Sequence, residues 1–213
     1  QVSSAASDVY KRQDLSILNK LGIKICVIHG GGPRIQKELE KSNIQSKFIR
    51  GLRVTDEKII DIVENVLIDF NNDIVSSLEK MGTKAVGIHT KKNNIIEVLR
   101  DAPELGFVGT PNKINNEIIL NIIKDGKIPI ISPLGLQENQ AFNINGDVAA
   151  GKIAQSLKCR RLLLMTNVEG VLDQNKKLIE EISSSEILQM IKNETITSGC
   201  LLYTSPSPRD TRE

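Results

Sequence analysis

Residues 25 to 34 read Ile-Cys-Val-Ile-His-Gly-Gly-Gly-Pro-Arg, and this stretch guides the interpretation of the whole chain. Its four apolar residues predict a short buried strand, and Pro33 stands where the first turn of a helix running through Leu39 tolerates proline. The three glycines leave bare amides at a helix N-terminus, where the helix dipole favours negative charge. We expect a phosphate or carboxylate there, although a glycine turn alone more often marks only a tight connection.

The composition is that of a globular protein that binds a small molecule. The 213 residues are 39% hydrophobic, 25% charged and only 3% aromatic, with a net charge of +2, so no basic surface for nucleic acid is indicated. No apolar run could cross a bilayer and no leader begins the chain, so we expect a cytoplasmic protein without membrane partners. Cys26, Cys159 and Cys200 are too few for a disulfide framework or a zinc site, and no metal site is predicted.

Both ends of the chain differ from its middle. Residues 1–13 lack helical or strand periodicity, and residues 200–213 are rich in proline and serine. We interpret both as flanks foreign to the domain, with ordinary disordered termini as the alternative. The domain itself is predicted at residues 14–199.

Between the flanks, strand and helix patterns alternate, which predicts an α/β fold with a mostly parallel sheet and helices on both faces. Gly51 divides two β-rich pieces of a predicted hairpin, Asp56 and Asn115 are expected to cap helices, and Gly82 and Gly126 to end them. Strands are predicted at residues 85–89, 95–99, 106–109 and 128–132, with a turn at 110–111; helices are predicted at 57–70, in a second piece to 81, and at 116–125.

Polar side chains gather near the start of the stretch at residues 142–157. Asn143 and Asn145 alternate with apolar residues, so both amides are expected on one side of an extended segment, and Asp147 begins the following helix. These three groups are predicted to converge. The commoner use of Asn145 or Asp147 is as a helix N-cap, and the two roles are compatible.

Three further predictions concern the end of the domain. A strand is expected at residues 161–166, and the turn at 167–173 either embraces a nucleotide or only reverses the chain. Ser183 and Glu186 have the spacing of a capping box that opens a helix through Ile191.

Four short motifs, taken together, point to a family. In chain order they are His29-Gly-Gly-Gly-Pro33, Gly51-Leu-Arg-Val-Thr55, Asn143-Ile-Asn-Gly-Asp147 and Leu164-Met-Thr-Asn-Val-Glu-Gly-Val-Leu172. They resemble the amino acid kinase family over about residues 15–199, and the second motif is similar to its acetylglutamate-phosphorylating branch. The resemblance implies ATP-dependent phosphorylation of the γ-carboxylate of N-acetyl-L-glutamate, which gives N-acetyl-L-glutamyl 5-phosphate, the second step of arginine biosynthesis.

The resemblance also implies a fold and a set of site residues. The fold would be a three-layer αβα sandwich, with a substrate lobe at roughly 14–127, the start of an ATP lobe at roughly 128–199, and self-association into a homo-oligomer. Magnesium would arrive with the ATP. By resemblance, the catalytic residues are Gly31, Gly32 and Asp147, which orients catalytic lysines; Gly31, Gly32, Arg53, Asn143 and Asn145 bind the substrate; and Thr166, Asn167, Val168, Gly170, Val171 and Leu172 bind the nucleotide.

The implied reaction suits these residue types. A γ-carboxylate is already ionised at neutral pH, so it needs no general base, and the enzyme must supply positioning and charge neutralisation. Arg53 offers a planar fork for a carboxylate, although without the motif a solvated charge on a hairpin would be the preferred interpretation. Because no base is needed, His29 is expected to be structural.

The chain departs from the family pattern at both ends. The family begins with a strand that carries a catalytic lysine and a Lys-x-Gly-Gly loop, and a second catalytic lysine follows the segment matching residues 196–199; neither is present, and neither Lys11 nor Lys152 lies in a matching motif. We therefore interpret the chain as an internal fragment with little or no activity of its own. The alternatives are another acylphosphate-forming kinase of the same fold and a non-catalytic small-molecule-binding remnant, whereas the glycine spacing argues against a Rossmann dehydrogenase.

Overall fold

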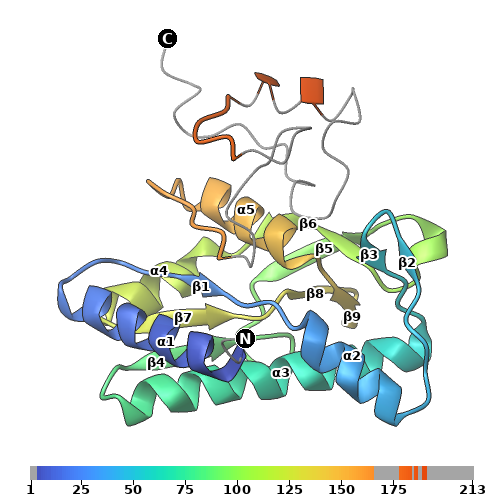
Figure 1. Cartoon of the computed structure of the whole chain (residues 1–213), viewed down its shortest axis with the longest axis horizontal. Coiled ribbons are helices and arrows are strands. Elements are labelled where there is room, and N and C mark those ends of the chain that lie inside the picture. Colours follow the sequence, from blue (N-terminus) through green and yellow to red (C-terminus); the bar gives the residue numbers. More distant parts are fainter. Residues whose placement is uncertain (1–3, 166–177, 184, 187–188, 191–213) are drawn as a thin grey trace.

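Helices and strands alternate through the computed structural model, which describes residues 4–165, 178–183, 185–186 and 189–190 (Figure 1). None of the helices in these ranges is long and apolar enough to cross a membrane. In chain order the elements are α1 (Ser4–Lys20), β1 (Val27–Ile28), α2 (Gly32–Lys41), β2 (Phe48–Ile49), β3 (Leu52–Arg53), α3 (Glu57–Lys80), β4 (Ala85–Ile88), β5 (Ile96–Arg100), η1 (Pro103–Leu105), β6 (Gly109–Ile114), α4 (Asn116–Lys124), β7 (Ile128–Ile131), β8 (Leu134–Gln137), β9 (Gln140–Asn143) and α5 (Gly146–Ser156).

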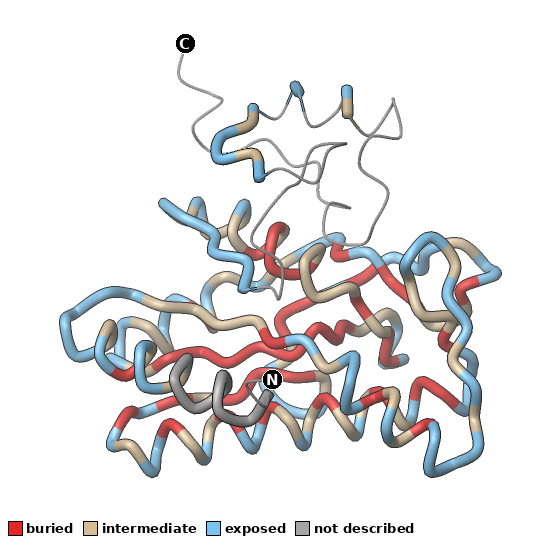
Figure 2. The backbone as a smooth tube through the Cα atoms, viewed as in Figure 1, coloured by how far each residue is buried: buried red, intermediate tan, exposed pale blue. Residues whose placement is uncertain are grey.

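A parallel sheet in the order β1-β7-β4 forms the middle layer, as the alternation of elements predicts. Consecutive strand residues point to opposite faces, and Ile130 and Ile131 accordingly enter different parts of the core. Ile130 packs with residues of α3, and Ile131 packs with residues of α4 and α5. The central strand β7 is buried along its whole length, whereas β1 at the edge of the sheet is only half-buried, and Figure 2 shows buried backbone running through the middle of the molecule.

A second sheet, in the order β6-β5-β8-β9, extends this core and is mostly antiparallel. β5 runs parallel to β8, whereas β5–β6 and β8–β9 are antiparallel pairs. The hairpin between β8 and β9 was not among the predicted elements; its turn residues Glu138 and Asn139 both have positive φ. The predicted boundary between the lobes, near residue 128, is the start of β7. Because β7 pairs with β1 on one side and β4 on the other, that boundary would assign strands of one parallel sheet to different lobes.

The predicted helix starts and the predicted hairpin are confirmed. Asp56 caps α3 by accepting hydrogen bonds from the backbone N–H groups of Lys58 and Ile59, at 3.0 and 2.9 Å. Asn115 caps α4 by accepting from Glu117 N, and β2 and β3 pair around Gly51. The capping box is also present, since Glu186 N donates to Ser183 Oγ and Ser183 N donates to Glu186 Oε2.

Several predicted boundaries were wrong. α3 is one helix of 24 residues rather than two pieces, because nothing in its sequence breaks the helical hydrogen bonds. The strand predicted at residues 106–109 lies instead at Gly109–Ile114, and Pro111 is inside it rather than in a turn. β6 is an edge strand whose partner has an irregularity between Glu97 and Val98, and proline is tolerated at such places because a ladder donor is not needed.

The start of the domain also differs from the prediction. α1 begins at Ser4, so residues 4–13 are helical and not a flank without regular structure. Its sequence contains neither glycine nor proline, so no residue in it breaks a helix. The helix was not predicted because its apolar residues show only a weak helical periodicity. The helix is anchored at its C-terminal half, where Leu15 packs in the core beside α3 and Ser16 Oγ shares a 2.5 Å hydrogen bond with Thr83 Oγ1.

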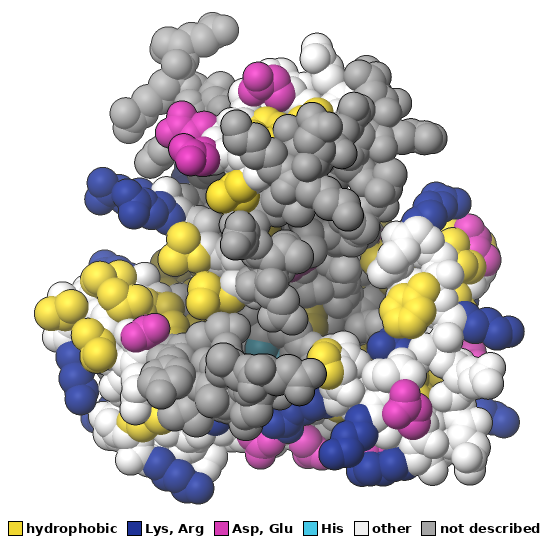
Figure 3. Space-filling model, viewed as in Figure 1, with side chains coloured by type: hydrophobic (Ala, Val, Ile, Leu, Met, Phe, Trp, Pro, Cys, Tyr) yellow, Lys and Arg dark blue, Asp and Glu magenta, His cyan; other side chains and the backbone are white. Residues whose placement is uncertain are grey.

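The strand predicted at residues 161–166 is not formed over 161–165, the part that the structure describes. The four apolar side chains of residues 162–165 are 40, 74, 45 and 67% exposed. The prediction rested on this apolar run, but a strand also needs a paired neighbour, and none of the strands given above pairs with it. Figure 3 shows that hydrophobic side chains are exposed in several places on the face of the molecule in view.

Replacing Asp56 with alanine is expected to lower the free energy of unfolding by about 1 kcal/mol, because two N–H groups of α3 lose their acceptor. Urea denaturation measures this change. Asp61→Ala is the matched control, since Asp61 lies exposed inside the same helix and caps nothing. Equal losses in the two variants would contradict the assignment of Asp56 as the cap.

Candidate functional site

The glycine turn of residues 30–32 lies between the N-termini of two helices. It follows β1, and α2 begins at its end, with Gly31 as the N-cap and Ile35 N donating to Gly31 O at 2.9 Å. α5 starts beside it, since a Cβ built on Gly146 would lie 3.9 Å from Gly30 Cα. Two helix dipoles therefore place their positive ends near this turn, which favours an anion there.

The three glycines of the turn have different reasons for being glycine. A Cβ on Gly31 would lie 2.3 Å from Leu67 Cδ2, so the core leaves no room for a side chain. Among the described residues, nothing lies within 4 Å of a Cβ on Gly30 or Gly32. Packing therefore explains Gly31, whereas open space beside Gly30 and Gly32 leaves their backbone approachable by a ligand.

Arg53 lies at the same helix end, at the start of α2. Its guanidinium donates to Ser46 Oγ and to Gln36 Oε1 (3.1 Å), and Nη2 lies 3.5 Å from Gly32 O. The group also stands over the Phe48 ring at 4.7 Å. The side chain is half-buried, and this burial lowers the pKa of the guanidinium from its usual value. The hairpin and α2 thus hold a cation beside the glycine turn.

Asn143 is connected to Arg53 through Thr55. Asn143 Nδ2 donates to Thr55 Oγ1 at 3.3 Å, and Thr55 Oγ1 donates to the Arg53 carbonyl at 2.9 Å. Thr55 is fully buried, and the backbone N–H of Asn143 donates to Phe107 O at 2.9 Å. The end of β9 and the end of β3 are therefore held at a fixed separation, with Asn143 linked through Thr55 to the backbone of Arg53; that both side chains bind one substrate stays a prediction.

The two polar residues after Asn143 have separate local roles. Asn145 Oδ1 accepts from the backbone N–H groups of Asp147 and Val148, at 3.0 and 3.1 Å, so this side chain caps α5. The capping alternative is thus confirmed for Asn145, and its oxygen is committed to the helix. Asp147 lies in the first turn of α5, half-buried, and burial raises the pKa of its carboxyl.

His29 is buried and does not resemble a general base. Burial is the main cause that lowers its pKa to about 4, and its nitrogens are bonded to protein groups. The imidazole is therefore neutral at pH 7, in agreement with the structural role expected for it.

The predicted nucleotide residues, Thr166, Asn167, Val168, Gly170, Val171 and Leu172, lie outside the described residues. Sequence reasoning missed Thr55, Gln36 and Ser46. Thr55 ends the Gly51–Thr55 motif and could have been found there, whereas nothing in the sequence marks Gln36 or Ser46, which reach Arg53 only through the tertiary fold.

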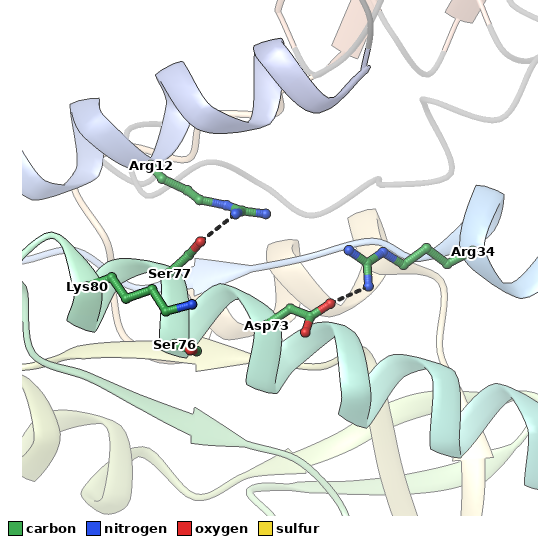
Figure 4. Close-up of a pocket in the computed structure, with 6 residues that line it drawn as sticks. All are labelled: Arg12, Arg34, Asp73, Ser76, Ser77 and Lys80. Carbon is green, nitrogen blue, oxygen red and sulfur yellow. Dashed lines mark hydrogen bonds and ion pairs between the residues drawn. The ribbon is translucent and has the colours of Figure 1, made fainter.

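A polar cleft of about 230 Å³ lies between α1, α2 and α3 (Figure 4). Its lining residues are Arg12, Arg34, Asp73, Ser76, Ser77 and Lys80. Arg12 donates to Ser77 Oγ at 2.7 Å, and Arg34 pairs with Asp73 at 2.6 Å. These arginines are already bonded within the cleft, so we assign no ligand to it.

Residues 12–202 match the amino acid kinase family. The chain belongs to this family. A Pelagibacter ubique protein named acetylglutamate kinase is 50% identical over 190 residues, which cover 89% of this chain and 66% of that protein. A Ruegeria pomeroyi protein of the same name is 41% identical over 201 residues, 93% of this chain and 70% of that protein. The chain thus spans about two thirds of the length of these curated amino acid kinase relatives.

Solved structures support the amino acid kinase fold. A crystal structure from Streptococcus mutans UA159 matches with a TM-score of 0.81 and 29% identity, covering 88% of this chain and 78% of that one. N-acetylglutamate synthase from Neisseria gonorrhoeae, complexed with coenzyme A and N-acetyl-glutamate, matches with a TM-score of 0.76 and 21% identity, covering 88% and 44%. At that identity the second likeness concerns the fold alone.

Proposed function

We propose that the whole protein transfers the γ-phosphate of MgATP to the γ-carboxylate of N-acetyl-L-glutamate. The observation that carries this proposal is the Arg53 guanidinium held beside Gly32 in a member of this family. The 50% identity to a protein named acetylglutamate kinase supports the choice of substrate. The product is then N-acetyl-L-glutamyl 5-phosphate, made in the cytoplasm for arginine biosynthesis.

On the substrate side, Arg53 and Asn143 supply recognition. A planar guanidinium donates two parallel hydrogen bonds to a carboxylate, which fits the α-carboxylate of the amino acid. Asn143 carries both a donor and an acceptor and can pair with the acetamide group. Thr55 holds the Asn143 side chain near the backbone of Arg53, because its hydroxyl accepts from Asn143 and donates to the Arg53 carbonyl.

On the phosphate side, the glycine turn supplies charge stabilisation. The Gly31 and Gly32 amides lie at the start of α2, where N–H groups and the helix dipole stabilise developing negative charge. The nucleophilic carboxylate is ionised at neutral pH, so no side chain has to remove a proton. MgATP supplies the phosphoryl group; its proposed contacts at residues 166–172 lie outside the described structure, and Asp147 is proposed to orient cationic groups of the whole protein.

Steady-state phosphorylation by the whole protein tests this function. With MgATP and a panel of N-acetyl-L-glutamate, L-glutamate, L-aspartate and carbamate, we expect the highest kcat/KM for N-acetyl-L-glutamate. Unacetylated glutamate is the matched control, since it differs only in the acetyl group that Asn143 is proposed to bind. A preference for any other member of the panel would overturn the substrate assignment.

A further inference from the structure

The buried His29 side chain holds the glycine turn through hydrogen bonds at both of its ring nitrogens. Nδ1 lies 2.7 Å from the carbonyl oxygen of Gly30. Nε2 lies 3.1 Å from Ser132 Oγ and 3.2 Å from Asn71 Nδ2. The ring also makes an edge contact with Phe70 at 5.0 Å. These contacts come from the ends of β1 and β7 and from the middle of α3, so three elements fix the ring.

The Gly30 carbonyl and the Asn71 amide favour one protonation state of the ring, whereas the Ser132 hydroxyl can donate or accept. A carbonyl oxygen can only accept, so Nδ1 must carry the hydrogen that reaches Gly30. The amide nitrogen of Asn71 can only donate, so Nε2 must present its lone pair. The orientation of the Asn71 amide is itself fixed, because Nδ2 also donates to the Ile130 carbonyl at 2.9 Å, and a flipped amide would face that carbonyl with an oxygen.

The hydrogen bond from His29 to the Gly30 carbonyl fixes the orientation of the Gly30–Gly31 peptide. In a trans peptide the C=O of one residue and the N–H of the next point in opposite directions, and the described residues contain no cis peptide. Holding the Gly30 carbonyl toward the His29 ring therefore aims the Gly31 N–H away from the ring. Among the hydrogen bonds of the described residues, this N–H has no acceptor.

We propose that His29 is a positioning residue, which, as the neutral Nδ1–H tautomer held by Asn71 and Ser132, orients the Gly30–Gly31 peptide so that the Gly31 amide faces the anion. The identity of that anion rests on the proposed function; the hydrogen-bond network does not. His29 acts through the backbone and touches no reacting atom.

The charges around His29 favour the same neutral state. Burial is the main cause that lowers its pKa to about 4, the bond to Gly30 opposes the shift, and the charges of Arg34 and His89 add to the lowering. Arg34 lies on α2 and is always charged, whereas His89, which follows β4, has a lowered pKa of its own because it is partly desolvated, so its charge adds to the effect only where it is protonated. The tautomer is therefore expected to persist down to about pH 5.

¹⁵N NMR of the histidine-labelled chain tests the tautomer directly, because the chain has only two histidines and His89→Asn assigns the signals. We expect a protonated Nδ1 and an unprotonated Nε2 for His29 between pH 5 and 8. A protonated Nε2 would overturn the proposal, whether or not the protein binds any ligand.

The effect on the turn is tested with two substitutions. His29→Asn keeps a donor near the position of Nδ1, whereas His29→Leu has none. With N-acetyl-L-glutamate as the probe, followed by the Gly31 amide shift, we expect Leu to weaken binding about tenfold and Asn by less than about threefold. Equal weakening would overturn the positioning role. If neither variant folds, the tautomer measurement alone decides, and failure of the unsubstituted whole protein to bind would count against the proposed function instead.

Discussion

Gly106→Ala is expected to lower the free energy of unfolding by roughly 3 kcal/mol or more, the largest effect of any single alanine substitution proposed for this chain. Two costs combine at this position. Gly106 has φ of +72°, which L-residues rarely adopt, and its Cβ would lie 2.3 Å from the carbonyl oxygen of Thr55. That oxygen accepts a hydrogen bond from Phe107 N at 2.6 Å, so it cannot withdraw without losing a backbone bond.

Gly126→Ala is the matched control for this experiment. Gly126 has nearly the same φ, +71°, but no described residue lies within 4 Å of a Cβ built on it. It therefore carries only the conformational cost, roughly 1 kcal/mol. Urea denaturation of both variants separates the two contributions. Equal destabilisation would show that the contact with Thr55 relaxes freely, and the packing argument would then fail.

The contact at Gly106 also concerns the candidate site. Thr55 is the residue that joins Arg53 to Asn143, and its backbone is held by Leu105 and Phe107 on either side of Gly106. A shift of Thr55 would therefore change the separation of the two proposed substrate-binding residues. Gly106 is not one of the proposed site residues, but through Thr55 it constrains the separation of two of them.

Local patterns explain what could be predicted of the fold. Asp56 and Asn115 were found as caps because their side chains bond to amides only two or three residues away. Gly51 marked its hairpin because it and Arg50 both adopt positive φ, which a tight turn requires. The periodic apolar residues of α3 gave the direction of its buried face, although they did not show that the helix was continuous.

Non-local pairing explains what could not be predicted. β7 enters the sheet between β1 and β4, and no local signal says which strands a segment of four buried residues will join. The same holds for residues 161–165, whose apolar run was predicted as a strand but pairs with none of the described strands. Pro111 was predicted to lie in a turn. It lies instead in an edge strand, and the sequence could not show this because the position of a strand at a sheet edge depends on tertiary structure.

The candidate site divides in the same way. Arg53 and Asn143 were predicted through motifs, and in the structure Thr55 links the Asn143 side chain to the backbone of Arg53. The sequence does not distinguish Gly31 from Gly32. Only the position of Leu67 shows that core packing requires a glycine at residue 31 and not at residue 32. Asn145 was consistent with two compatible roles, of which the helix cap was the commoner, and the structure confirms the cap because its oxygen accepts from amides of α5.

The second large effect is expected from Arg53→Ala in the whole protein. We expect KM for N-acetyl-L-glutamate to rise about 30-fold, the equivalent of about 2 kcal/mol for a charge-assisted carboxylate contact, while KM for ATP changes little. Arg53 lies beside Gly32 and is half-buried, so its loss also removes a cation from the start of α2. Arg53→Lys is expected to recover only part of the affinity, because an ammonium cannot form the planar pair of hydrogen bonds.

Two controls separate substrate binding from stability. Arg50→Ala removes an arginine from the same hairpin, whose side chain is 80% exposed and lies 3.7 Å from Glu104, so KM should stay unchanged. Arg53 also bonds Gln36 and Ser46, and urea denaturation of Arg53→Ala measures what those contacts contribute to the fold. If both KM values rose together, or if the rise followed the loss of stability, Arg53 would serve the hairpin and not the substrate, because a lost carboxylate contact weakens one ligand alone.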